Sequence, residues 1–332
     1  MPDHSNDITI ARVSPDRTFS AARRLVGASQ ADPDAAAMRL VENAKAGRLD
    51  LSLLFAAESA GTIRQVCLLA PSSGRTAALF LSEPLPQGDL GGEEQALVDR
   101  AACIAAAEAY AAQHLSDHVA VLQALPEPEE LWSMNALRLA GLSHVGDLTY
   151  LRRPIGRHSG IFARPPAMPS WPQGVSVKPL SALPGPFDTH APMLCDLLDR
   201  TYEGTLDCPA LCGLRDTRDV LDSHRGVGQF DPALWFVVFR GERPEGCMLL
   251  SPSEELRSVE LVYLGLTPAL RGQGLGARLL DLAFRVVPRS TCDHMTCAVD
   301  RANTPAARIY QHAGFRPFGE RAAFVKRVHR TT

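Results

Sequence analysis

The sequence predicts an α/β (α+β) protein made of two similar domains in tandem. Runs of β-branched and apolar residues alternate with helical patterns in both halves, starting with ITIARV in the first and VSVKPL in the second. A proline-rich stretch separates the halves, which end in similar sequences. The chain has 332 residues, which is more than one hydrophobic core usually serves.

The stretch from Arg152 to Gly174 interrupts the alternation of strands and helices with five prolines. Prolines at this density are incompatible with helix interiors and central strands, so we predict an extended connector. The predicted domains are residues 1–153 and 174–332, joined by a linker at 154–173.

Two similarities between the halves indicate a tandem repeat. The segment AGL followed by LTYLRR closes the first half, and AGF followed by AFVKR closes the second. Farther upstream, LFLSEPLPQGDLGG resembles YLGLTPALRGQGLG. Repetition of one domain explains both similarities. The alternative is two α/β units that merely share a glycine after a helix.

Composition excludes several classes of protein. No apolar run is long enough to cross a membrane, and the N-terminus lacks the basic-then-apolar order of a secretory signal. The formal charge of −3 supplies no basic field for nucleic acid. The eight cysteines form no CxxC pair, and we interpret even Cys208 and Cys212 as packing residues. We therefore predict a cytoplasmic protein without metal, nucleic-acid or membrane partners, and leave the oligomeric state open.

A glycine-rich loop between a strand and a helix is the clearest chemical motif. The apolar run VELVYLGL ends at Leu266, and the loop Arg271-Gly272-Gln273-Gly274-Leu275-Gly276 follows before a helical pattern that starts near Ala277. Glycines let backbone N–H groups converge on an anion at a helix N-terminus, and an arginine adds a fork suited to phosphate. The loop therefore predicts a diphosphate site.

Two other diphosphate motifs fit the loop less well. The spacing from Gly272 to Ala277 also satisfies a dinucleotide fingerprint, but the first glycine does not follow its strand at once and no series of strand–helix units follows. An ATP-binding P-loop requires Lys and Ser or Thr after the last glycine, whereas Ala277 follows Gly276.

A second motif follows at residues 298–319, AVDRANTPAARIYQHAGFRPFG, in which Tyr310 comes seven residues after Asn303 and Gly314-Phe315 comes next. Together with the Arg-x-x-Gly-x-Gly loop, this segment resembles the GNAT superfamily of N-acetyltransferases. The resemblance covers the C-terminal half. It implies domains with a mixed, mostly antiparallel twisted sheet flanked by helices, acetyl-coenzyme A as co-substrate, and no metal.

The resemblance also implies roles for particular residues. The strand end Leu264-Gly265-Leu266 would bind the pantetheine arm, Asn303 would fix the coenzyme, and Tyr310 would protonate the leaving thiolate. Glu260 matches the general base of histone-acetylating members, with a plain strand-end carboxylate as the alternative. The implied coenzyme-binding residues are Leu264, Gly265, Leu266, Arg271, Gly272, Gln273, Gly274, Leu275, Gly276, Ala277, Asn303 and Tyr310.

We expect the acceptor to lie between the first helices of the second domain and the strand of Glu260. Tyr202, Glu203, Asp207 and Trp235 are the candidate acceptor residues, although the first three could equally form a capped loop. His294 is interpreted as a surface residue.

The N-terminal half departs from the motifs. Its equivalent loop lacks the arginine and carries Asp89, Glu93 and Glu94, which would repel a diphosphate, and Leu137 stands in the place of Tyr310. We therefore predict a degenerate GNAT domain, as in known tandem members of the family, kept for scaffolding or for shaping the acceptor pocket.

The predicted function is acetyl-coenzyme A-dependent transfer of an acyl group directly to a primary amine of a small molecule or peptide. The alternative is a coenzyme A-binding sensor or pseudoenzyme that regulates a partner. The presence of both Glu260 and Tyr310 favours the enzyme, because binding alone needs neither.

Overall fold

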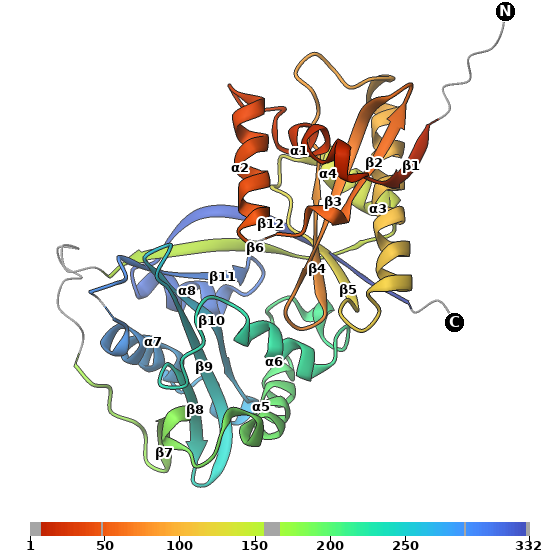
Figure 1. Cartoon of the computed structure of the whole chain (residues 1–332). Coiled ribbons are helices and arrows are strands. Elements are labelled where there is room, and N and C mark those ends of the chain that lie inside the picture. Colours follow the sequence, from red (N-terminus) through yellow and green to blue (C-terminus); the bar gives the residue numbers. More distant parts are fainter. Residues whose placement is uncertain (1–7, 48, 156–166, 289, 330–332) are drawn as a thin grey trace, which may run out of the picture. The chain divides into compact units, whose positions relative to one another are not determined.

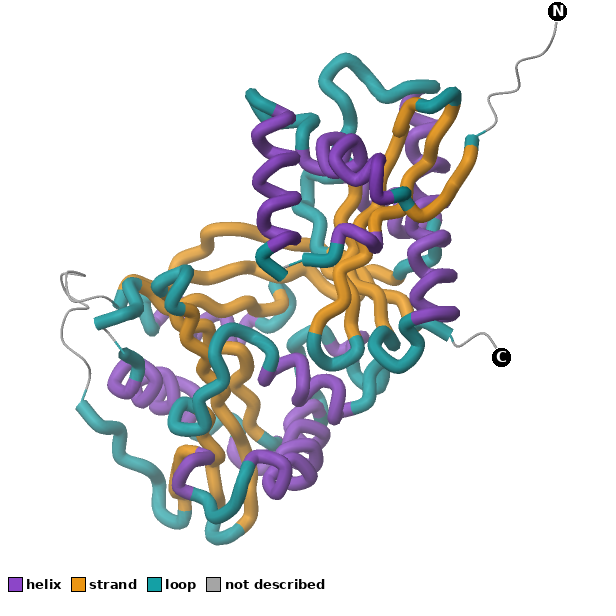
Figure 2. The backbone as a smooth tube through the Cα atoms, viewed as in Figure 1, coloured by secondary structure: helices purple, strands orange, loops and turns teal. Residues whose placement is uncertain are grey.

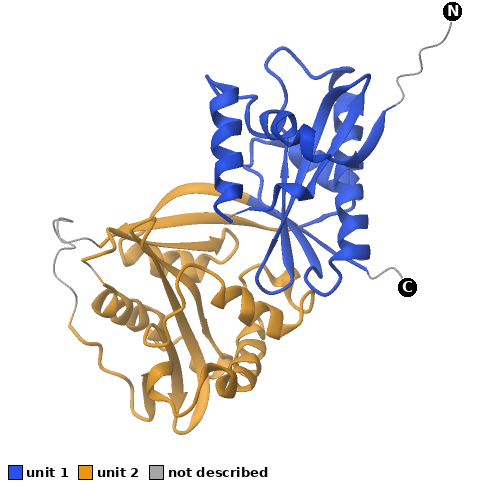
Figure 3. Cartoon of the chain, viewed as in Figure 1, with its two compact units in different colours: residues 1–144, 322–332 blue, residues 145–321 orange. Residues whose placement is uncertain are grey.

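The computed structural model describes residues 8–47, 49–155, 167–288 and 290–329. The chain divides into two compact units, unit 1 (residues 1–144 and 322–332) and unit 2 (residues 145–321), as Figure 3 shows. Most of the predicted linker, residues 156–166, lies outside the described residues. None of the described helices is both long and apolar enough to cross a membrane.

Unit 1 contains a mixed sheet in the order β1-β2-β3-β4-β5-β12 (Figure 1). Its neighbouring strands are antiparallel except for β4 and β5. The strands are β1 (Thr9–Arg12), β2 (Leu54–Ser59), β3 (Thr62–Ser72), β4 (Thr76–Leu81), β5 (Val121–Ala124) and the end of β12 (Arg316–Arg327). The helices are α1 (Thr18–Val26), α2 (Pro33–Lys45), α3 (Gly92–His114) and α4 (Leu131–Leu139), with 3-10 turns at Pro15–Arg17 and Leu51–Leu53.

The core of unit 1 lies largely between α3 and the sheet. One face of this long helix carries Cys103, Ile104, Ala107 and Ala111, all fully buried against residues of β2, β3 and β4. α3 is rich in alanine, and these small side chains let the helix approach the sheet closely.

Unit 2 contains a second mixed sheet, in the order β6-β11-β10-β9-β8-β7, in which only β10 and β11 are parallel. The strands are β6 (Ser143–Pro154), β7 (Val175–Pro179), β8 (Trp235–Arg240), β9 (Arg243–Ser253), β10 (Ser258–Leu266), β11 (His294–Asp300) and the start of β12. The helices are α5 (Phe187–Tyr202), α6 (Thr217–Arg225), α7 (Leu275–Val286) and α8 (Thr304–His312), with 3-10 turns at Leu180–Ala182, Pro209–Leu211 and Pro268–Leu270.

Helices cover both faces of this second sheet, α7 and α8 on one side and α5 and α6 on the other (Figures 1 and 2). Strand β10 contributes to both cores because its side chains alternate. Val259 and Leu261 are buried in the core that contains α7, whereas Val262 and Tyr263 pack into the core that contains α5. A β-bulge between Leu261 and Tyr263 shifts the register at this point, where the family's active site is expected.

The two sequence halves exchange their last strands. Strand β6 ends the first half, yet it pairs with β11 of unit 2 from Leu148 to Pro154. The end of β12 closes the second half but pairs with β5 of unit 1. The contact-based boundaries at 144/145 and 321/322 therefore differ from the predicted boundaries at 153 and 174. Sequence order cannot reveal such an exchange, because hydrogen bonding between strands decides which sheet a strand joins.

Candidate active site

A cavity of about 240 Å³ opens in unit 2 where β10 and β11 separate. Parallel pairing between these strands covers only Ser258–Glu260 and His294–Thr296. Beyond it, β10 stays paired with β9 and β11 with β6, so the facing strand edges border the cavity. Such edges offer backbone N–H and C=O groups to an extended ligand.

The lining of this cavity unites residues that are far apart in the sequence. It includes the predicted coenzyme residues Leu264, Gly265, Leu266, Arg271, Asn303 and Tyr310, together with the predicted acceptor residue Asp207. The remaining lining residues are Thr201, Gly204, Thr205, Leu206, Leu261, Val262, Tyr263, Ala298, Val299, Pro305 and Ala306.

The glycine loop forms the predicted strand–loop–helix connection. Gly272 and Gly274 have φ angles of +74° and +71°, and α7 begins directly after, at Leu275. These left-handed conformations are strained for residues with a side chain. A Cβ added at either glycine would meet no atom within 4 Å, so the space above the loop is open at the helix N-terminus. This arrangement fits a diphosphate.

Arg271 has other partners than the predicted phosphate. Its guanidinium donates to the carbonyl oxygens of Leu266 at 2.9 Å, Thr201 at 2.8 Å, Glu203 at 2.8 Å and Gly204 at 3.2 Å. Three of these carbonyls belong to the end of α5 and the residues just after it, where helical carbonyls lack partners within the helix. The side chain therefore joins the glycine loop to the end of α5 and the residues after it, and its role as a phosphate fork stays a prediction.

The new role of Arg271 predicts a loss of stability and order when the side chain is removed. Arg271→Ala should lower the free energy of unfolding by about 2 kcal/mol, since several charge-assisted bonds to carbonyls are lost. It should also increase proteolytic cleavage in the segment from Glu203 to Cys208. Thermal denaturation and limited proteolysis check both effects. The same denaturation and cleavage in Arg271→Ala as in the native chain would contradict this assignment.

Asn303 and Tyr310 lie on the other wall of the cavity. Asn303 caps α8 by accepting a hydrogen bond from the Ala306 N–H at 3.3 Å, which fixes the start of this helix. Tyr310 is buried with 9% exposure, and its ring packs edge-on against Phe315. Burial raises the pKa of Tyr310, so its phenol stays protonated and can donate a proton.

Glu260 lies next to the cavity rather than in its lining. It follows Val259 near the start of β10, and its side chain is exposed. Neighbouring protein atoms nevertheless displace part of the water around the carboxyl group, and this desolvation raises the pKa of Glu260 above its usual range. A carboxylate with a raised pKa is a better proton acceptor, which suits the predicted base.

The predicted acceptor residues have different positions. Asp207 lines the cavity and accepts a hydrogen bond from the Asp300 N–H at 2.8 Å, which ties the loop after α5 to β11. Tyr202 is half-buried against Tyr263, outside the lining. The side chain of Glu203 is exposed, and its carbonyl oxygen bonds Arg271.

Trp235 does not fit its predicted role. Only 1% of the residue is exposed, and its ring packs against Phe187 and Phe230 in the core beside α5. A side chain inside this core has no route to an acceptor, so its assignment to the acceptor site was wrong. Trp235 begins the apolar run WFVVF of β8, and this run indicates a core position.

Sequence reasoning missed Tyr263. Its hydroxyl lies 2.7 Å from the Thr201 hydroxyl, and its ring lies over Gly265, where an added Cβ would come 2.5 Å from the phenol oxygen. The ring of His224 stacks on the Tyr263 ring, with the ring centroids 5.4 Å apart. A tyrosine inside the apolar run VELVYLGL was the available signal, because a polar atom in a core strand needs a partner.

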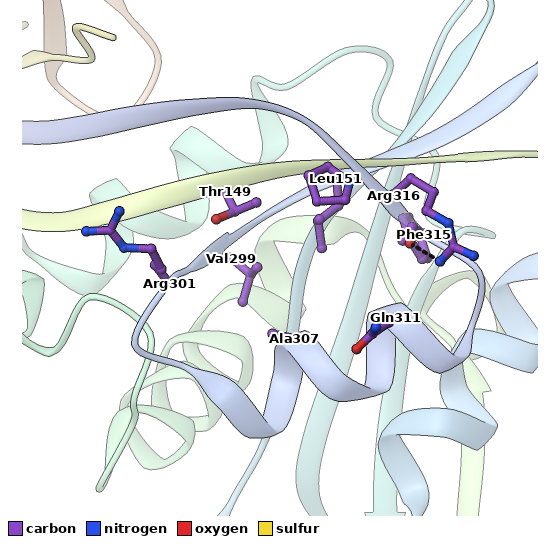
Figure 4. Close-up of a pocket in the computed structure, with 9 residues that line it drawn as sticks. Thr149, Leu151, Val299, Arg301, Ala307, Gln311, Phe315 and Arg316 are labelled. Carbon is purple, nitrogen blue, oxygen red and sulfur yellow. Dashed lines mark hydrogen bonds between the residues drawn. The ribbon is translucent and has the colours of Figure 1, made fainter. Parts of the chain in front are cut away.

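A larger cavity of about 460 Å³ lies between α8 and the strands β6, β11 and β12 (Figure 4). Its lining contains none of the residues predicted for the site. The lining residues are Thr149, Leu151, Val299, Arg301, Ala307, Gln311, Phe315, Arg316 and Pro317. We assign the site to the smaller cavity, since the chemically capable groups gather there. Among the described residues, no group of three or more His, Cys, Asp or Glu side chains could hold a metal ion.

The corresponding loop of unit 1 is filled by its own side chains. Asp89 is buried between Arg24 at 3.0 Å and Arg100 at 2.8 Å, with 4% of its side chain exposed. Glu93 and Glu94 are exposed in the first turn of α3. The carboxylate of Asp89 thus forms ion pairs with Arg24 and Arg100, so the positive charge of these arginines is already neutralised. Leu137, in the place of Tyr310, is fully buried in the unit 1 core.

Comparison with known proteins agrees with this geometry. The family model described as "Acetyltransferase (GNAT) family" matches residues 193–315, which contain the whole cavity. This segment belongs to the GNAT family. The prediction of an N-acyltransferase domain is therefore confirmed at the level of the family.

Curated relatives place the GNAT segment beside mycothiol acetyltransferases. The chain is 28% identical over 178 residues to the enzyme of Streptomyces scabiei, covering 54% of this chain and 53% of the relative. It is 30% identical over 111 residues to the mycothiol acetyltransferase of Beutenbergia cavernae. This alignment covers 32% of this chain and 37% of the relative. The aligned region spans about half the length of the first of these relatives. Over this region the chain is thus similar to mycothiol acetyltransferases.

Solved structures show the same fold over the whole chain. A GCN5-related N-acetyltransferase from Sphaerobacter thermophilus aligns with a TM-score of 0.58 at 17% identity, covering 97% of this chain and 96% of the other. A tandem GNAT protein from the clavulanic acid biosynthesis pathway aligns with a TM-score of 0.50 at 15% identity. The alignment covers 98% of this chain and 100% of the other. The predicted fold of two GNAT-like domains is thus confirmed.

Proposed function

We propose that this GNAT protein transfers an acetyl group from acetyl-coenzyme A directly to a primary amine of a small molecule or peptide. The observation that carries the proposal is the cavity between the diverging strands β10 and β11. It brings the Leu264–Leu266 strand edge, Asn303 and Tyr310 together beside the glycine loop. The mycothiol acetyltransferase relatives support a small-molecule amine as the acceptor.

Groups on the cavity wall and the neighbouring Glu260 share the proposed reaction. The amine nitrogen attacks the thioester carbonyl carbon, so that a C–N bond forms and the C–S bond breaks. Backbone N–H groups near Gly265 stabilise the oxyanion that develops at the carbonyl oxygen. Glu260 receives the proton lost by the amine, directly or through water, and Tyr310 gives its proton to the departing sulfur.

The test is a panel of primary amines, including amino sugars, amino acids and short peptides, assayed by thiol release and by mass spectrometry of the product. An acceptor-dependent mass increase of one acetyl group is the expected result. Tight coenzyme A binding without transfer to any amine of the panel would instead favour a coenzyme A-binding sensor.

The two units should differ in coenzyme binding. Calorimetry with coenzyme A should give one molecule per chain, because Asp89 occupies the loop of unit 1 and the cavity in unit 2 is open. Gly274→Val should abolish this binding, since its side chain would fill the open space above the loop and strain a left-handed residue. A stoichiometry of two, or binding that survives Gly274→Val, would contradict the assignment.

A further inference from the structure

The sheet face that carries Glu260 extends onto strand β6. Glu260 is paired with Thr296 of β11, and Thr296 is in turn paired with Arg152 of β6. Directly paired residues point to the same face of a sheet, so Arg152 and Glu260 share one face. Two strand spacings separate their backbones, a distance of about 10 Å.

The neighbouring residues of β6 confirm the orientation of Arg152. Figure 4 shows Leu151 pointing into the cavity beside α8, with Thr149 also in its lining. Alternation along the strand therefore directs Tyr150 and Arg152 to the opposite face. Tyr150 is paired with Ala298, an exposed residue that lines the candidate active site. The face thus runs from the active-site cavity to Arg152.

Arg152 is a cation held in place on this face by an aromatic ring. Its guanidinium lies 5.3 Å from the ring centre of Phe318, and Tyr150 meets the same ring edge-on at 6.1 Å. Arg152 and Phe318 are both exposed, with 50% exposure for the phenylalanine. Among the residues that the structure describes, no carboxylate forms an ion pair with Arg152. A planar guanidinium stacked in this way keeps its N–H groups for an anion.

Cationic side chains lie near this face beyond Glu260, with Asp293 as the opposing charge at His294. The charge of Arg152 reaches β11, where it adds to burial in lowering the pKa of His294. Burial raises the pKa of Tyr150, and the positive charge of Arg321 partly opposes this rise. Arg321 therefore lies near Tyr150. An acceptor whose amine is at Glu260 therefore meets cationic side chains farther along the same face.

We propose that Arg152, supported by Tyr150 and Phe318, binds an anionic group of the acceptor, which is then a primary amine that also carries a carboxylate or a phosphate. This inference rests on the proposed function for the position of the amine. The anion lies roughly 5–10 Å from the reacting nitrogen, given the strand spacing and the reach of both side chains. Since β6 comes from the first half of the sequence, that half contributes acceptor-binding residues to the active site.

The test compares matched acceptors of increasing length. We would measure thiol release and calorimetric binding, in the presence of coenzyme A, for ω-amino acids from β-alanine to 6-aminohexanoate, with the amino alcohols of equal length as neutral partners. Aminoalkyl phosphates of the same lengths distinguish phosphate from carboxylate. The variants are Arg152→Gln, Arg152→Lys as the conservative replacement, and Arg240→Gln as a control on an exposed arginine at the far end of β8.

We expect the anionic acceptors to be preferred at least tenfold in affinity or kcat/KM over the amino alcohols, with an optimum of chain length. Arg152→Gln should remove that preference while leaving the neutral acceptors unchanged, Arg152→Lys should restore part of it, and Arg240→Gln should preserve it. Equal binding of anionic and neutral acceptors, or an equal effect of Arg152→Gln on both, would overturn the inference. Selective binding lost in Arg152→Gln but without thiol release would uphold anion recognition and refute the proposed enzyme activity.

Discussion

Tyr310→Phe should lower kcat by roughly 10²-fold to 10⁴-fold, the usual contribution of a positioned proton donor. Tyr310 lines the cavity, and burial raises its pKa. The phenol therefore keeps its proton until it donates that proton to the departing thiolate. A contact with the leaving group acts mainly in the transition state, so the Kd of acetyl-coenzyme A should stay within about threefold. Rapid-quench kinetics and calorimetry measure the two quantities separately.

A control for this prediction is Tyr110→Phe. The Tyr110 hydroxyl accepts a hydrogen bond from Arg12 in unit 1, and its removal should leave kcat unchanged. If Tyr310→Phe weakened coenzyme binding as much as it slowed turnover, Tyr310 would be a packing residue beside Phe315 rather than the acid.

Glu260→Gln should lower kcat/KM and remove the acidic limb of its pH profile. As a base, Glu260 must be ionised, so native kcat/KM should fall as the pH drops through its pKa, which burial raises. Burial raises the pKa of Tyr150 and of Cys297, and the charge of Glu260 raises both further, so Glu260 lies near both groups. Glutamine does not titrate, so this limb should vanish.

Activity of Glu260→Gln should partly return at high pH, because the acceptor amine then loses its proton without help. Initial rates across the pH range, at subsaturating acceptor, measure this behaviour. Glu254→Gln, which changes an exposed carboxylate just before β10, should keep the native profile. An unaltered acidic limb in Glu260→Gln would assign the base to another group or to solvent.

Local chemistry made the backbone conformation around the candidate site predictable. Glycines at 272 and 274 adopt the left-handed conformations that a turn into α7 requires, and Asn303 caps α8 as its position suggested. These features depend on residues only a few positions apart. Spacing along the chain therefore predicts them, together with the position of Tyr310 on the buried side of α8.

The wrong assignment of Trp235 and the incomplete predictions concern side chains whose partners lie in other elements of the structure. Arg271 bonds carbonyls at the end of α5, about 70 residues away. Asp89 pairs with Arg24 of α1 and Arg100 of α3. The ring of Trp235 packs against the rings of Phe187 and Phe230. Charge or aromatic character alone says nothing about such partners.

The sequence by itself determined the family, the two similar halves and the conformation of the glycine loop, because these follow from local spacing and backbone conformation. Only the tertiary structure decided that β6 pairs with β11 and that β12 returns to β5. It thereby placed Arg152 on the face of Glu260. The physical reason is that strand pairing satisfies backbone hydrogen bonds between distant segments, and a run of strand-forming residues does not specify its partner.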